Sequence, residues 1–188
     1  CIVKFLHQKS SNPKIENAIR LYEEILYDIA YKIKQCNSPY GYVSMGSTII
    51  CKVKAYIAVG GMPQKSAAED FYFMQSLAKF SQINFLNKTL VYPSSRLEMR
   101  VHLGTGFRML QYNKNDKFID LSFADRCYNS LKKLINFVDS NYKISYNLFI
   151  KELNKNFDYN ICNFLSEHNL ENIWDKINNN ASSKKQFL

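Results

Sequence analysis

The chain has 188 residues, of which 46% are hydrophobic and 22% charged, so its composition is that of a globular rather than a disordered protein. Its 25 basic and 16 acidic residues give a formal charge of +9, which favours an anionic partner: nucleic acid, lipid headgroups or a phosphorylated small molecule. Five widely spaced cysteines without a CxxC pair argue against a zinc site and indicate a reduced, cytoplasmic protein.

The first part of the chain predicts a strand followed by a long helix. Residues 1–7 are rich in β-branched and aromatic side chains, which is typical of a short strand. Asn12-Pro13 provides a cap and a proline at the first helical position, and apolar residues then recur at helical spacing. The pattern predicts an amphipathic helix over residues 13–35, ended by Asn37-Ser38-Pro39.

The next segment predicts a buried strand and a short helix. Val43 to Val53 contains small residues followed by apolar ones, and Gly46 suggests that another group approaches the backbone closely. Lys54 to Val59 predicts a short helix, which Gly60-Gly61 ends.

Two adjacent acids begin the second strong helix, predicted over about residues 67–79. Ser66 and Glu69 have the spacing of a capping box, in which each side chain satisfies a free backbone N–H group. Acids in a first helical turn also complement the helix dipole. Glu69 therefore has a structural explanation, whereas Asp70, one step around the helix, is the better candidate for facing a cleft.

Residues 82–109 predict two short strands and then a loop. Gln82–Leu86 and Thr89–Tyr92 have strand composition and are joined by Asn87-Lys88, as a hairpin or as sequential sheet edges. Pro93 to Met109 shows no periodicity, and a loop of that length is usually functional or mobile. The basic residues that it carries are Arg96, Arg100, His102 and Arg108. They fit a solvated surface or an anion site, and a metal site at His102 is the less favoured hypothesis.

From Ser122 onward the pattern is helical only. Apolar residues form a stripe between Ala124 and Val138, and shorter helices are predicted around residues 146–156, 160–168 and 170–178.

Five motifs occur in order between residues 46 and 106. They are Gly46-Ser47-Thr48, Tyr56-x-x-Val59-Gly60-Gly61-Met62, Ala68-Glu69-Asp70-Phe71-Tyr72-Phe73-Met74, Val91-Tyr92-Pro93-Ser94-Ser95-Arg96 and Arg100-Val101-His102-Leu103-Gly104-Thr105-Gly106. Together they resemble the C-terminal half of a bacterial family 2 glycosyltransferase with the GT-A fold. The resemblance covers residues 43–106 well and 13–42 loosely, and leaves 110–188 unplaced. His102 departs from the narrower branch, which has proline there.

The resemblance implies roles for both acids. Asp70 would be the catalytic base, which deprotonates an acceptor hydroxyl as it attacks the anomeric carbon of a nucleotide-sugar with inversion. Glu69 would orient the acceptor. The substrate-binding residues expected from the resemblance and from charge are Gly46, Ser47, Gly61, Arg96, Arg100 and His102.

The chain begins without methionine and already in strand-like sequence, so we expect it to be part of a longer protein. The resemblance places the nucleotide-binding half and its metal-binding Asp-x-Asp upstream of Cys1. A divalent metal, Mg or Mn, is therefore expected in the full-length enzyme but not in this part, which we expect to be inactive alone.

These patterns together predict a mixed α/β fold. Residues 1–109 are assigned to a partial GT-A-like sheet with flanking helices, the acceptor-side half of a catalytic domain, and residues 110–188 to an all-helical extension. The expected reaction is inverting transfer from a nucleotide-sugar donor to a hydroxyl of a cell-surface glycan or lipid-linked acceptor.

The expected location is the cytoplasm, at the inner face of a membrane whose anionic lipid suits the +9 charge. Nucleic acid is not a partner in this hypothesis, and a homo-oligomer is left open. The alternatives are a basic helical module on residues 110–188 that binds nucleic acid or protein, and a structural, non-catalytic fragment.

Overall fold

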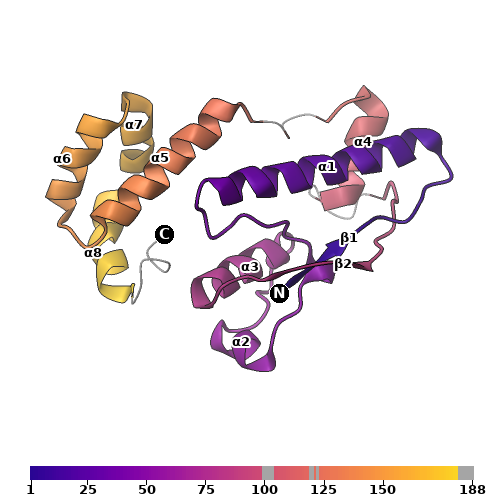
Figure 1. The fold of residues 1–188 in the computed structure, drawn as a ribbon, viewed down its shortest axis with the longest axis horizontal. Helices are drawn as coiled ribbons and strands as arrows, with labels where there is room; N and C mark the ends of the chain where they lie inside the picture. Colours follow the sequence, from indigo (N-terminus) through magenta and orange to yellow (C-terminus); the bar gives the residue numbers. More distant parts are fainter. Residues whose placement is uncertain (99–103, 119–120, 122, 182–188) are drawn as a thin grey trace. The chain divides into compact units, whose positions relative to one another are not determined.

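The computed structural model describes residues 1–98, 104–118, 121, 123–181, and these fall into two compact units, Cys1–Lys132 and Lys133–Leu188. Within the described residues the fold is mixed and mainly helical, with eight α-helices, one short 3-10 helix and a two-stranded parallel sheet (Figure 1). The division falls inside helix α5 (Asp125–Asn141), whereas the sequence placed a boundary after residue 109. No helix among the described residues combines the length and the apolar character needed to cross a bilayer.

The sheet consists of β1 (Ile2–Phe5) and β2 (Phe85–Val91). The predicted strand at residues 1–7 is confirmed, but the two strands predicted around Asn87-Lys88 are wrong, because a single strand runs through both residues. The register passes from Val3 opposite Leu86 to Lys4 opposite Thr89. Asn87 and Lys88 therefore form a bulge-like irregularity within the parallel strand pair, and the chain does not reverse direction there.

The strand predicted over residues 43–53 is also wrong. Gly46–Thr48 forms the 3-10 helix η1, in which the Thr48 hydroxyl donates to the Met45 carbonyl over 2.8 Å. Strand-like contact in this segment is limited to an isolated antiparallel bridge between Ile49 and Ile2 and to the backbone hydrogen bonds that Ile50 exchanges with Cys1. A serine or threonine side chain that bonds to a nearby backbone group competes with a strand ladder, and here the local turn prevails.

Helix α1 (Pro13–Gln35) has the predicted bounds. The Asn12 side chain accepts from the N–H groups of Lys14 and Ile15, and proline occupies the first turn. Its apolar face packs against Met109 of α4 (Gly104–Asn115). The loop predicted over residues 93–109 is therefore wrong from Gly104 onward. Although the apolar periodicity of this segment is weak, the burial of Met109 against α1 stabilises it as a helix.

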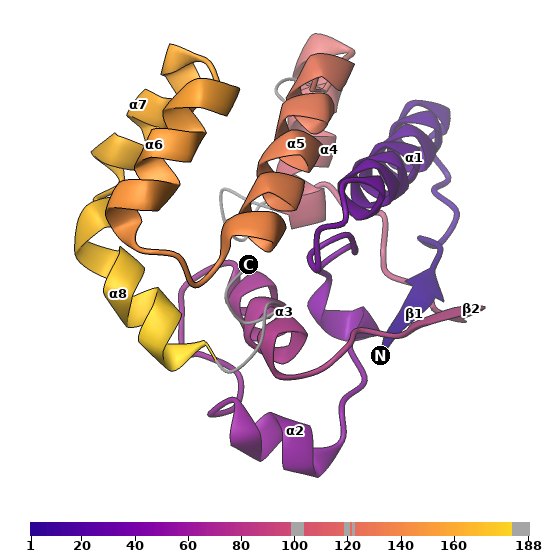
Figure 2. The same ribbon diagram turned by 60° about the vertical axis from the view of Figure 1, so that its left-hand side comes forward.

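Helix α2 (Val53–Ala58) confirms the short helix, and Gly60 and Gly61 end it with φ of 78° and 76°. Helix α3 (Glu69–Phe80) lies between α1 and α2 (Figures 1 and 2). Its inner residues Phe73, Met74 and Leu77 form one core with Ile2 of β1.

The second unit contains most of α5 and the helices α6 (Tyr146–Asn156), α7 (Tyr159–Glu167) and α8 (Leu170–Asn180), which confirm the helices predicted there. Phe149, Leu153 and Trp174 form its buried core. The Trp174 indole N–H donates to the Ile144 carbonyl over 2.9 Å, so its polar atom is satisfied inside the core.

Candidate active site

Asp70 links two motifs that are 24 residues apart. The Gly46 N–H donates to Asp70 Oδ2 over 2.9 Å, and the Phe71 N–H donates to Oδ1 over 2.8 Å. The first bond fastens η1 to the start of α3. The structure therefore brings together Asp70 and Gly46, two of the residues that the sequence proposed for one site.

The Asp70 carboxylate keeps capacity for a further partner. A carboxylate has about four acceptor positions on its two oxygens, and the two backbone N–H groups occupy two of them. The Asp70 residue is only partly buried, and Gly46 and Ser47 beside it are exposed. A hydroxyl within about 3 Å of either oxygen would have the geometry that proton abstraction requires.

Gly46 leaves the flank of the carboxylate open. A Cβ built at this position would lie 3.6 Å from Asp70 Cβ and 3.7 Å from Oδ2. Both values are ordinary van der Waals contacts, so alanine would fit, but it would occupy the space beside the carboxylate. The absence of a side chain at residue 46 therefore leaves the Asp70 carboxylate accessible, and the backbone conformation does not require glycine there.

The capping box predicted for Ser66 and Glu69 is not formed. Ala68 precedes the helix in the left-handed conformation, with φ of 60°, and provides no side-chain cap. Glu69 is exposed, and its side chain has no hydrogen bond or ion pair among the described residues. Because the cap position falls on Ala68, the Asp70 side chain bonds to a first-turn N–H group in place of serine.

Gly61 is connected to α3 through the side chain of Tyr56. A Cβ at Gly61 would come within 3.0 Å of the Tyr56 ring, and that ring packs edge-on against Phe73 with centroids 5.5 Å apart. The left-handed backbone of Gly61 and its close approach to Tyr56 both favour glycine here. Gly61 therefore supports the position of α3 through Tyr56.

The predicted basic residues are not brought to Asp70 by any described contact. Arg96 is 46% exposed and pairs with Glu98 at 3.9 Å. It follows Pro93, whose carbonyl accepts from the Gln8 N–H beyond the end of β1, whereas η1 lies at the start of β1. Arg100 and His102 lie outside the described residues.

A partly buried ionic cluster joins the segment just after β1 to α1 and α4, and sequence reasoning missed it. The His7 side chain is buried, with Nδ1 2.8 Å from Glu23 Oε1. Arg20 donates to Glu23 Oε2, to Glu16 Oε1 and to the His7 carbonyl, each over 2.8 Å. On the other side of the ring, His7 Nε2 lies 3.5 Å from Thr105 Oγ1. The i,i+4 and i,i+3 spacing on α1 is visible in sequence, but nothing local connects it to His7.

The cluster holds both of its carboxylates in the ionised form. Burial by itself would raise the pKa of Glu23, but hydrogen bonds from the His7 side chain and backbone and from Arg20 outweigh it and lower that pKa. The Arg20 side chain likewise lowers the pKa of Glu16. We interpret the cluster as a cross-link between elements, since its charges are satisfied by one another.

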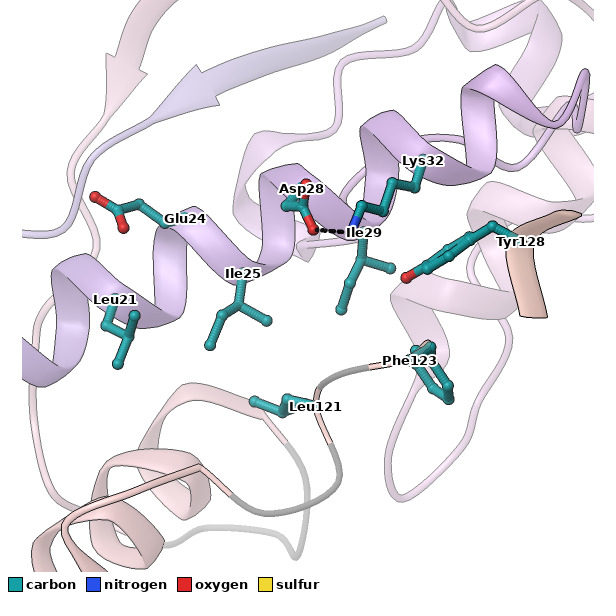
Figure 3. A pocket seen from close by; sticks show the side chains of 9 residues that line it. All are labelled: Leu21, Glu24, Ile25, Asp28, Ile29, Lys32, Leu121, Phe123 and Tyr128. Carbon is teal, nitrogen blue, oxygen red and sulfur yellow. Dashed lines mark ion pairs between the residues drawn. The ribbon is translucent and has the colours of Figure 1, made fainter. Parts of the chain in front are cut away.

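A groove of about 220 Å³ runs along α1 (Figure 3). Leu21, Ile25 and Ile29 form one wall, opposite Leu121, Phe123 and Tyr128. Lys32 on its rim pairs with Asp28 at 3.1 Å. None of the site residues predicted from sequence lines the groove. The described part of the chain also holds no group of three or more His, Cys, Asp or Glu residues placed to bind a metal ion.

Comparison with known proteins found no match to this chain among protein-family models, curated proteins or solved structures.

Proposed function

We propose that this chain is the acceptor-side part of an inverting, GT-A-type glycosyltransferase in which Asp70 is the general base. The observation that carries the proposal is the hydrogen bond between Gly46 and Asp70, which joins two of the resembling motifs around a partly exposed carboxylate. The glycine at residue 46 also leaves the space beside this carboxylate free of a side chain, as an acceptor site there would need.

In the proposed reaction an acceptor hydroxyl donates a hydrogen bond to a free acceptor position of Asp70. The hydroxyl proton passes to the carboxylate as the hydroxyl oxygen attacks the anomeric carbon of the sugar from the face opposite the leaving group. The bond from that carbon to the nucleotide diphosphate breaks, and the diphosphate oxygen keeps the electron pair. Attack on the opposite face inverts the configuration. General-base assistance of this kind typically contributes about 10²–10⁴ in rate.

The remaining expectations form part of the same proposal. Glu69, exposed beside Asp70, would orient the acceptor, and Ser47 would contact the sugar. Arg96 and Arg100 would bind the diphosphate or a phosphorylated acceptor. The described carboxylates do not fit a metal site, so a Mg or Mn ion would depend on residues elsewhere in the enzyme, and no step is assigned to it. The acceptor would be a cell-surface or lipid-linked glycan at the inner membrane face.

The distribution of charge favours this proposal over a basic helical binding module. Residues 1–109 hold 14 basic and 7 acidic side chains, whereas residues 110–188 hold 11 and 9. Most of the net positive charge thus lies with the candidate site and not on the C-terminal helices, which would need it to bind nucleic acid.

The test is Asp70→Asn in the natural polypeptide that contains this chain. Asparagine keeps one oxygen that can accept from Gly46 but loses the acceptor of the Phe71 N–H group, so we expect an unchanged circular dichroism spectrum and a small fall in melting temperature, with kcat reduced at least about 100-fold. The matched control is Glu24→Gln, which removes one exposed carboxylate from α1. Transfer by Asp70→Asn at a near wild-type rate would refute the proposed base. A large fall in melting temperature with unchanged kcat would show that Asp70 only holds η1 to α3.

A further inference from the structure

Helix α2 presents apolar side chains that the rest of its unit leaves uncovered. Val53 is 74% exposed and Ile57, one helical turn later, is 71% exposed. Ile50, just before the helix, is 52% exposed. Single exposed apolar residues are ordinary, but three such aliphatic side chains within eight residues form a patch that calls for a partner.

The exposure follows from the way α2 is anchored. Its opposite side carries Ala55, with Val59 just beyond the helix, and both pack against the core that contains Ile2 and Phe73. Figures 1 and 2 show α2 on the side of α3 that faces away from α1. The orientation of α2 is therefore set by packing, and Val53 and Ile57 point outward because Ala55 points inward.

The same surface is basic. Lys52 and Lys54 are exposed and flank Val53 in sequence. Between Asp28 and Glu69 the chain contains five lysines and no acidic residue. We name Ile50, Lys52, Val53, Lys54 and Ile57 the α2 surface. It combines aliphatic groups with positive charge in a stretch that contains no acid between Asp28 and Glu69.

We propose that the α2 surface docks on an anionic phospholipid bilayer, with Val53 and Ile57 entering the headgroup boundary and Lys52 and Lys54 contacting lipid phosphates. A six-residue helix offers too little area for a stable protein interface, which needs about 800 Å² from each partner. Protein interfaces are also depleted in lysine and enriched in arginine and aromatic residues, unlike this surface.

The docking extends the proposed function, and its consequence for catalysis rests on the proposed role of Asp70. Because α2 packs beside α3, a docked α2 surface would hold Asp70 near the membrane, where the hydroxyl of a lipid-linked acceptor lies. The binding itself does not depend on catalysis, so it can be measured separately.

The experiment is co-sedimentation of the natural polypeptide with vesicles of phosphatidylcholine containing about one third phosphatidylglycerol, a strongly anionic surface. We expect binding that weakens with added salt and is absent from pure phosphatidylcholine. Lys52→Ser with Lys54→Ser should lower the partition coefficient about 30-fold, since each lysine near an anionic surface contributes about a fivefold factor. Val53→Ser with Ile57→Ser should lower it about tenfold or more.

The matched control is Lys79→Ser with Lys88→Ser, which removes the same charge from exposed positions outside the α2 surface. Equal losses in the control and in the lysine variant would overturn the proposal, because binding would then follow net charge alone. Wild-type binding by both α2 variants would overturn it too. A change of oligomeric state in the α2 variants without lipid would also overturn it and assign the surface to a protein interface.

Transfer to a water-soluble acceptor separates the two proposals. The α2 variants should retain it, and Asp70→Asn should bind vesicles like the wild type without transferring sugar. If vesicle binding follows the α2 surface but Asp70→Asn transfers normally, the docking holds and the catalytic proposal fails.

Discussion

The backbone N–H of Gly46 donates to the carboxylate of Asp70 over 2.9 Å, across 24 residues of sequence. The bond unites a 3-10 turn and a helix start that each have an ordinary local explanation. It also shows that the backbone contacts expected of Glu69 are made by Asp70. Glu69, for which a capping function was predicted, is exposed, and Asp70 carries the backbone contacts.

Substitution of Gly46 tests whether access to the carboxylate matters. We expect Gly46→Ala to change the free energy of unfolding by less than about 0.5 kcal/mol, because its Cβ would make only ordinary contacts with Asp70. Transfer should nevertheless slow, and Gly46→Val should slow it further, because each added carbon fills space beside Oδ2. Urea unfolding and kcat/KM measure the two effects. Unchanged kcat/KM in the valine variant would argue against a substrate at this position.

Gly60 and Gly61 allow a paired test of backbone strain and close contact. Both have left-handed φ, so alanine at either position should cost about 1–2 kcal/mol of stability. At Gly61 the added Cβ would also lie 3.0 Å from Tyr56, whereas at Gly60 it would meet no atom within 4 Å. We therefore expect Gly61→Ala to be the more destabilising of the two in urea unfolding. Equal losses would show that the Tyr56 ring moves aside freely.

The cluster of His7, Arg20 and Glu23 predicts a dependence of stability on pH. The lowered pKa of Glu23 means that its contribution is present above the ordinary value of 4.5 and is lost as the pH falls through the folded-state pKa. At neutral pH we expect Glu23→Gln to reduce the free energy of unfolding by about 1–3 kcal/mol. The difference from wild type should shrink in acid below that value.

Urea unfolding across the acid range measures this difference, with Glu24→Gln as the control. Glu24 neighbours Glu23 on α1 but is exposed, so its substitution should leave stability nearly unchanged. A pH-independent loss in Glu23→Gln would mean that packing, and not the ionised carboxylate, supplies the stability.

The core of the second unit offers a test with its own optical probe. Leu153 is fully buried beside Trp174, the only tryptophan in the chain. Leu153→Ala should therefore reduce stability by about 2–5 kcal/mol through lost burial and a residual cavity. Tryptophan fluorescence during urea unfolding reports on this core directly. A loss below about 1 kcal/mol would indicate that the neighbouring side chains collapse into the space.

Several local signals in the sequence predicted the structure correctly, although the capping box at Ser66 and Glu69 did not form. The bounds of α1 follow from a cap at Asn12, a proline beside it and apolar residues at helical spacing, all of which act within a turn or two. Helix α2 stops just before Gly60 and Gly61 for an equally local reason, because both glycines adopt a positive φ. The errors at Asn87-Lys88 and after Gly104 occurred where distant contacts overrode local pattern, whereas at residues 43–53 a local turn formed in place of the expected strand.

The sequence by itself determined most helices, the strand at the N-terminus, the concentration of positive charge in residues 1–109 and the motifs around Gly46 and Asp70. Only the tertiary structure decided that β2 is one strand, since its partner β1 lies some 80 residues away along the chain and pairs in parallel. It also joined Asp70 to Gly46 and His7 to Glu23. The physical reason is the same in each case. Capping and periodicity act over a few residues, whereas strand pairing and buried polar contacts depend on which distant groups the folded core brings within bonding distance.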